Sequence, residues 1–203
     1  ALKINRDGTR NVASAAKKLD IPLVYISTDY VFGGRRKKPY GEDDQPNPLS
    51  IYGLSKYAGE KEVRSITKKH YIVRSAWLYG PNGKNFVLTI LRLADELPEL
   101  KIVNDQRGCP TYTFDLAAGI KKLIKTQKFG TYHLINSGSC TWFEFAKKIL
   151  KIKKIKKKII PISSKELNRP AKRPKYSALD NTKAQKIGIL MRPWQKALSS
   201  YLR

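Results

Sequence analysis

The sequence predicts an α/β protein in which helices cover both faces of a doubly wound parallel sheet. Short runs rich in β-branched and aromatic residues, at 23–27, 70–75 and 131–135, alternate with longer segments of helical periodicity. Helical segments of about ten residues or more can carry the chain back to the start of the next strand, which builds βαβ units. In such sheets ligands bind at the carboxyl ends of the strands, so the residues there are the first candidates for a site.

The expected elements follow one another along the whole chain. Strands are expected over residues 23–27, 70–75, 100–103 and 131–135, and a long loop rich in proline and glycine over residues 33–50. Helices are expected over residues 8–19, 51–69, 85–97, 114–126, 141–158, 182–187 and 193–202. Thr141 and Glu144 have the spacing of a capping box, which marks the start of a helix. Long loops in compact domains are usually functional, which draws attention to the loop before residue 51.

The composition places the chain among soluble globular proteins. Apolar residues make up 41% of the 203 residues, and no apolar run approaches the ~20 residues that cross a membrane. The first residues lack the apolar core of a secretory signal. Cys109 and Cys140 belong to no CxxC pattern and are expected to be reduced thiols of a cytoplasmic protein. His70 and His133 are isolated, so no metal site is expected, and Mg²⁺ is possible but not indicated by this sequence.

The charge is the unusual feature of the composition. Lysine and arginine number 41 against 16 acidic residues, which gives a formal net charge of +25. Such a field attracts polyanions, including nucleic acid and phosphorylated metabolites. The densest basic run, residues 147–158, repeats isoleucine every three residues and contains no aromatic side chain. This pattern favours a surface helix with a solvated face, and no specific nucleic-acid partner is expected.

A candidate site follows the first expected strand. Residues 27–30 read Ser-Thr-Asp-Tyr, whereas an ordinary exit from a strand needs only one turn-forming residue. Tyr52 and Lys56 lie four positions apart at the start of the next helix, on one face of it. An ammonium group close to a phenol lowers the pKa of the phenol and makes it a usable proton donor. The spacing alone is weak, because Tyr57 and Lys61 repeat it on another face of the same helix.

Longer sequence motifs point to a particular protein family. A hydroxyl residue at a strand end, followed by Tyr-x-x-x-Lys on the next helix, resembles the short-chain dehydrogenase/reductase family. Seven strings spread in order over essentially the whole chain resemble the dTDP-4-dehydrorhamnose reductases, an extended branch of that family: VYISTDYVFGG, YGEDDQPNPLSIYGLSKYAGE, IVRSAWLYG, GKNF, DQRGCPTY, GTYHL and RPAKRPKYSALD. The resemblance implies reduction of the 4-keto group of dTDP-4-dehydro-β-L-rhamnose with NADPH or NADH. A homodimer is a possible assembly.

The resemblance also implies roles for the residues of the reaction centre. Tyr52 would be the general acid that protonates the C4 oxygen of the sugar. Lys56 would hold the ribose of the nicotinamide and tune Tyr52, and Thr28 would hydrogen-bond the reacting oxygen. Ile26 would offer a backbone contact to the cofactor.

Further residues are implied for the substrate. Asp29 would contact the sugar and Trp77 would pack against the substrate, whereas Asn85 and Arg173 are candidates for the diphosphate. Each has a simpler alternative. Trp77 could be a core aromatic, Arg173 one of many surface charges, and Asp29 a turn residue.

Two departures from the family pattern stand out. Gly33 replaces the aspartate of the usual string YVFDG, and no GxGxxG or GxxGxxG loop occurs in the chain. The resemblance therefore implies a Rossmann-like sheet that lacks its first strands, as the carboxyl-terminal part of a chain of about 280 residues. The first expected strand would then expose an apolar edge, and the chain alone would bind cofactor barely or not at all.

The expected domains are discontinuous in the sequence. Residues 1–77 and 113–136 would form the carboxyl-side part of the NAD(P)-binding domain, and residues 78–112 and 137–203 a small α/β domain for the nucleotide sugar. A non-catalytic alternative stays open, because the regulatory β subunit of methionine adenosyltransferase resembles the same reductases. Turnover of reduced cofactor with a dTDP-4-keto sugar would separate the two.

Overall fold

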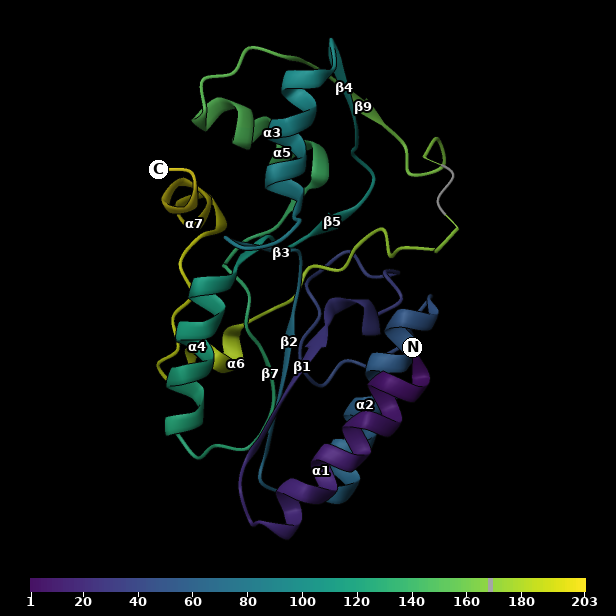
Figure 1. Ribbon diagram of the computed structural model, residues 1–203, viewed down its shortest axis with the longest axis vertical. Helices are drawn as coiled ribbons and strands as arrows, with labels where there is room; N and C mark the ends of the chain where they lie inside the picture. Colours follow the sequence, from purple (N-terminus) through teal and green to yellow (C-terminus); the bar gives the residue numbers. More distant parts are fainter. Residues whose placement is uncertain (168–169) are drawn as a thin grey trace.

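The computed structural model describes residues 1–167 and 170–203, in two parts that lie one above the other (Figure 1). Asn168 and Arg169 fall outside the described residues, and Arg169 is the first residue of the string RPAKRPKYSALD. In the lower part the described residues form a three-stranded parallel sheet in the order β1–β2–β7. Its strands are β1 (Leu23–Thr28), β2 (His70–Ser75) and β7 (Gly130–His133). The predicted parallel sheet is confirmed.

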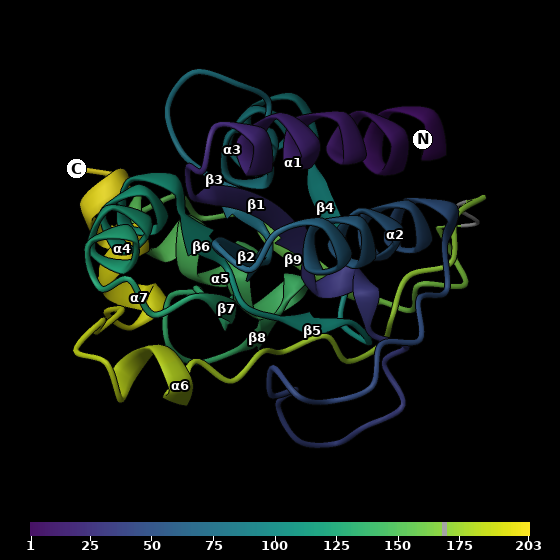
Figure 2. The same ribbon diagram turned by 90° about the horizontal axis from the view of Figure 1, so that it is seen from below.

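Helices cover both faces of this sheet. On one face Tyr25 and Ile72 pack with Val63 of α2, whereas on the other Val73 packs with Leu116 of α4. Figure 2 shows α2 and α4 on opposite sides of the strands. The helices of this part are α1 (Thr9–Lys18), α2 (Ile51–Ile66), α4 (Thr113–Lys125) and α6 (Thr182–Gln185), and a π-helical turn, Lys3–Gly8, precedes α1. The sheet is therefore doubly wound, as its apolar strands require.

The position of each strand in the sheet decides its burial. All six residues of β2, the central strand, are buried. In the described chain β1 pairs with β2 alone, so its other edge is open and Ile26 is 39% exposed. β1 ends at Thr28 and passes directly into a 3₁₀ turn, Asp29–Val31. The Ser-Thr-Asp-Tyr segment thus lies at the carboxyl end of the sheet, as expected.

The upper part is built from short two-stranded sheets and three helices. Its core contains Ile90 of α3, Phe145 and Ile149 of α5, and Leu198 of α7. The strands pair as β3 (Leu78–Tyr79) with β6 (Thr111–Tyr112), β4 (Glu99–Val103) with β9 (Lys158–Ile162), and β5 (Arg107–Gly108) with β8 (Cys140–Thr141). The helices are α3 (Phe86–Glu96), α5 (Trp142–Ile152) and α7 (Trp194–Tyr201).

The lysine-rich run corrects one sequence expectation. The capping box of Thr141 and Glu144 is confirmed at the start of α5, but the helix ends at Ile152 instead of continuing to residue 158. Lys154 has a left-handed backbone (φ 55°), and the chain then forms β9 beside β4. The local periodicity of the run matches a helix, whereas a strand partner about sixty residues away in sequence decides the outcome.

The two parts exchange chain segments. Ala184 and Ile189, which follow the predicted boundary at residue 137, pack in the core of the lower part with Leu134. The division into residues 1–77 with 113–136 and residues 78–112 with 137–203 stays a prediction. In the described part of the chain, no helix is both long and apolar enough to cross a membrane.

Candidate active site

The carboxyl end of β1 brings a hydroxyl and a carboxyl group together. The Thr28 hydroxyl donates to Asp29 Oδ1 (3.1 Å) and accepts from the backbone N–H of Tyr30 (3.2 Å). These bonds cap the 3₁₀ turn and hold both side chains at the strand end. The extended backbone of Thr28 lets the chain change direction there without strain.

The start of α2 is pressed against this turn. Ser50 caps the helix by accepting from the backbone N–H of Gly53 (3.2 Å). A Cβ at Gly53 would collide with the backbone carbonyl of Tyr30, so only glycine allows this close approach. The rings of Tyr30 and Tyr52 meet edge to face at 6.2 Å. The Tyr52 hydroxyl therefore lies close enough to the Thr28 side chain for Thr28 to lower the pKa of Tyr52.

The tuning of Tyr52 by Lys56 stays a prediction, and in the structure the two side chains have different surroundings. Partial burial raises the pKa of Tyr52, and the charge of Asp29 raises it further, although the Thr28 side chain opposes the change. The Lys56 ammonium lies 4.2 Å from the ring centre of Tyr25 instead. Burial lowers the pKa of Lys56, and the charge of Glu60 works against that shift. Tyr52 is therefore a protonated phenol at neutral pH, ready to donate.

Asp29 is the most unusual carboxyl group of the site. Its side chain is 2% exposed, and among the described residues its Oδ2 has no hydrogen-bond partner. Burial raises the pKa of Asp29 to about 7, although hydrogen bonds from Ser177 and Thr28 oppose the shift. The buried thiol of Cys109 lies close enough for Asp29 to affect its pKa. Near pH 7 this carboxyl is divided between an acceptor form and a neutral form that can donate.

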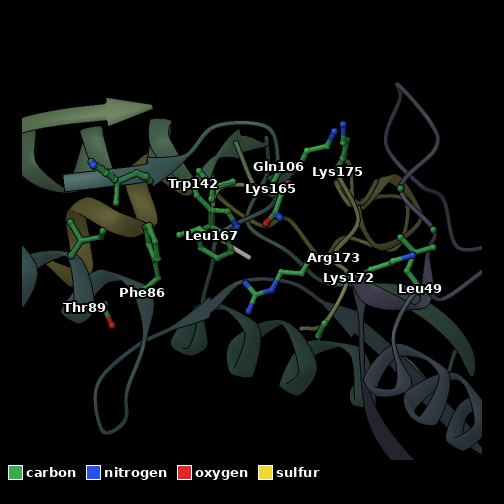
Figure 3. Close-up of a pocket in the computed structure, with 18 of the residues that line it drawn as sticks. Leu49, Phe86, Thr89, Gln106, Trp142, Lys165, Leu167, Lys172, Arg173 and Lys175 are labelled. Carbon is green, nitrogen blue, oxygen red and sulfur yellow. The ribbon is translucent and has the colours of Figure 1, made fainter. Parts of the chain in front are cut away.

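A cleft of about 800 Å³ lies beyond this strand end, and Thr28, Asp29 and Tyr52 are not among its lining residues (Figure 3). Gly33 and Leu49 line one end of it, so the segments that follow the 3₁₀ turn and precede α2 both reach it. Phe86 and Thr89 lie at the other end in Figure 3. Six cations line the cleft and no acid does so among the described residues. The cations are Arg35, Lys101, Lys165, Lys172, Arg173 and Lys175.

An aromatic stack forms one wall of the cleft. Trp77, with a left-handed backbone (φ 47°), lies parallel to Trp142 with ring centres 3.4 Å apart. The ring centre of Phe86 lies 4.5 Å from that of Trp142. Trp142 and Phe86 line the cleft, whereas Trp77 supports Trp142 from behind. Sequence reasoning missed Trp142, because its place in the cleft depends on the distant Trp77 and leaves no local signal.

The other predicted residues occupy different places. Arg173 lines the cleft, and Figure 3 shows its side chain between the aromatic wall and Leu49. Asn85 caps α3, with its amide oxygen accepting from Leu88 N–H and its nitrogen donating to the Gly80 carbonyl (2.9 Å). Its side chain is thus used within the fold, beside the cleft.

In the structure the residues predicted for the reaction centre lie together, and the other predicted site residues lie around them. Thr28, Asp29 and Tyr52 form one contact set, Lys56 follows one turn along α2, and Ile26 lies on the open edge of β1. No group of three or more His, Cys, Asp or Glu residues within the described part of the chain is arranged to hold a metal ion.

Comparison with known proteins gives matches over the whole chain. Residues 1–203 match the family described as RmlD substrate binding domain. The spore coat polysaccharide biosynthesis protein SpsK of Bacillus subtilis is 42% identical over 203 residues, which are all of this chain and 71% of that protein. A dTDP-4-dehydrorhamnose reductase of Sinorhizobium fredii is 38% identical over 211 residues, and the match covers 97% of this chain and 71% of that protein.

A solved structure gives the same match in three dimensions. The dTDP-4-dehydrorhamnose reductase of Bacillus anthracis, in complex with NADP, superposes with a TM-score of 0.96 at 48% identity. The match covers 99% of this chain and 72% of that one. The arrangement of strands and helices described above is therefore that of a Rossmann-like reductase.

Proposed function

This chain belongs to the RmlD substrate binding domain family of NAD(P)H-dependent oxidoreductases, and on that premise we propose that it reduces the 4-keto group of dTDP-4-dehydro-β-L-rhamnose. One observation carries the proposal. Tyr52 at the start of α2 lies beside the carboxyl end of β1, close enough for the Thr28 side chain to affect its pKa, and Lys56 lies one helical turn farther along α2. A carbonyl oxygen placed at the hydroxyls of Thr28 and Tyr52 can be polarised and protonated there.

Tyr52 is the general acid of the proposed reaction. Its raised pKa keeps the phenol protonated at neutral pH, so a proton is available when the carbonyl oxygen becomes negative. The new O–H bond forms as the phenol O–H breaks, and the phenolate then recovers a proton from solvent. Thr28 orients the reacting oxygen through its hydroxyl, and Asp29 in turn holds that hydroxyl by accepting its hydrogen bond.

The residues around Lys56 suit a reduced nicotinamide cofactor. When bound, this cofactor supplies the hydride that forms the C–H bond at C4. Among the described residues no carboxylate lies within ion-pair distance of the Lys56 ammonium, so this donor remains available for ribose hydroxyls. Ile26, on the open edge of β1, offers backbone groups beside it.

The cleft suits a nucleoside diphosphate joined to a sugar. Its cations, without a lining acid among the described residues, favour a diphosphate, and Arg173 can hold phosphate oxygens in a two-point contact. The aromatic wall of Trp142 and Phe86 offers a stacking surface for a base. Both predicted domains contribute lining residues, so both would contact the nucleotide sugar.

The test of the function is turnover with the proposed substrate. The intact protein that carries residues 1–203 should oxidise NADPH or NADH when dTDP-4-dehydro-β-L-rhamnose is added, followed by the loss of nicotinamide absorbance. The matched control replaces the keto sugar by dTDP-glucose, which has no carbonyl to reduce. Saturable cofactor binding without turnover on any dTDP-4-keto sugar would contradict the proposal and favour the regulatory-subunit alternative.

A second prediction concerns the aromatic wall. Trp142→Ala is expected to raise KM for the nucleotide sugar by about tenfold or more, because base–aromatic stacking contributes about 1–3 kcal/mol. The value of kcat should change much less, since Trp142 lies away from the reacting hydroxyls. Trp142→Phe keeps a ring at the same place and should retain most of the affinity. An unchanged KM in Trp142→Ala would remove this residue from the substrate site.

A further inference from the structure

A buried carboxylate joins α2 to the end of β1. Glu60 is fully buried, one turn beyond Lys56 on the same face of the helix. Its Oε1 accepts from the Ser27 hydroxyl (2.6 Å) and from Arg74 Nε (2.8 Å). Its Oε2 accepts from Arg74 Nη2 (2.7 Å) and Arg64 Nη2 (2.8 Å). The carboxylate is therefore held by β1, by β2 and by its own helix.

Arg74 extends the same connection to the loop that leads into α2. It is 1% exposed, and its Nη1 donates to the backbone carbonyl of Glu42 (3.2 Å). The same nitrogen lies 3.4 Å from Nε2 of His133 on β7. Burial lowers the pKa of His133 to about 3, so the ring is neutral and adds no second charge beside the guanidinium. One guanidinium thus fixes α2, the central strand and the preceding loop to each other.

Stability alone is a weak reason for such an arrangement. A buried ion pair must recover the cost of removing two charges from water, and apolar replacements are often equally stable or more stable. What the pair supplies here is geometry. Ser27 directly precedes Thr28, whereas Glu60 shares a helix with Tyr52 and Lys56.

We propose that Glu60 is a positioning residue for the reduction, because its bidentate contact with Arg74 and its bond with Ser27 set the register of α2 against the end of β1. This inference rests on the proposed function. The register decides where the Tyr52 hydroxyl meets Thr28, and a misplacement of about 1 Å can lower a rate by about 100-fold.

Glu60 also acts on the charge of Lys56. The groups that face the Lys56 ammonium are the Tyr25 ring on β1 and the Glu60 carboxylate on α2. Although burial opposes it, the contacts with Arg74 keep the pKa of Glu60 below its usual value, so the carboxylate stays ionised. Burial lowers the pKa of Lys56 and Glu60 raises it. Without this carboxylate, Lys56 loses its proton at a lower pH.

The experiment uses Glu60→Gln in the intact protein. The variant is expected to lower kcat about 10- to 100-fold with little change in KM for the sugar, and to move the alkaline limb of the kcat–pH profile to lower pH. Glu62→Gln is the matched control, because Glu62 lies on the same helix and forms a bidentate contact with Arg10 on α1. It should keep the kcat and the pH profile of the unchanged protein.

A double variant separates positioning from stability. Glu60→Gln leaves the Arg74 charge buried without its partner, which destabilises the fold. Glu60→Gln combined with Arg74→Gln removes both charges and should recover much of the melting temperature but not kcat. Recovery of kcat together with the melting temperature would overturn the proposal.

A readout without turnover keeps this inference distinct from the proposed function. If the unchanged protein reduces no keto sugar, the reaction assignment fails by itself. The Lys56 side chain can then be titrated by NMR in the unchanged protein and in Glu60→Gln, with Lys56→Arg to identify its signal. A fall in the pKa of Lys56 and a shift of the Tyr52 ring signals are expected in Glu60→Gln. An unchanged titration with unchanged Tyr52 signals would overturn the positioning role.

Discussion

Tyr52→Phe is expected to lower kcat by about 10²- to 10⁴-fold, because the proposed reaction loses its general acid while every other contact to the substrate remains. Tyr52 is half exposed, so the fold should tolerate the loss of its hydroxyl. The affinity for the nucleotide sugar should change little, since the cleft does not include this ring.

The control for this variant lies on the same helix. Tyr57→Phe removes a hydroxyl from the second Tyr–Lys pair, in which the Lys61 ammonium lies 4.8 Å from the Tyr57 ring centre. That ring packs against the cluster around Phe32 and lies on another face of α2 from Tyr52, so kcat should stay close to that of the unchanged protein. The comparison is made by steady-state kinetics on both variants. Near-normal turnover in Tyr52→Phe would exclude it as the proton donor.

Asp29→Asn is expected to make the protein more stable at alkaline pH than it is with the natural carboxyl. In the folded chain Asp29 keeps its proton up to about pH 7, whereas an unfolded aspartate loses it near its ordinary value of 3.8. Between these values the folded protein binds more protons, so its stability falls as the pH rises. Between about pH 5 and pH 8 the free energy of unfolding of the protein with Asp29 should therefore fall by about 3 kcal/mol more than that of the Asp29→Asn variant.

Urea unfolding at both pH values measures this difference. Asp20→Asn serves as the control, because Asp20 is a largely exposed carboxylate paired with Lys69 at the surface. That variant should follow the unchanged protein at both pH values. Equal pH dependence in Asp29→Asn and the unchanged protein would show that Asp29 is ionised throughout this range.

Residues whose roles depend on nearby sequence could be predicted from the sequence. The strand that ends at Thr28, the helix that carries Tyr52 and the capping box of Thr141 all depend on neighbours within a few positions. The candidate set of Thr28, Asp29 and Tyr52 followed from that order, and the structure brings these residues into contact.

Features that depend on distant contacts could not be predicted. The lysine run continues a helical pattern, and only its pairing with β4 turns residues 158–162 into a strand. The ammonium of Lys56 was expected beside Tyr52 because helix spacing permits it, but a ring from β1 takes that place. Trp142 gains its position in the cleft from a stack with Trp77, which no local spacing reveals.

The stacked indoles have a consequence for spectroscopy. Two of the three tryptophans in the chain, Trp77 and Trp142, lie nearly parallel with ring centres 3.4 Å apart. The third, Trp194, is buried and meets Phe145 edge to face. Indoles at this separation couple their excited states, so the pair should dominate the near-ultraviolet circular dichroism. Because Trp142 also lines the cleft, anything that binds there alters the coupling. The protein therefore carries a built-in optical reporter of cleft occupancy that requires neither label nor turnover.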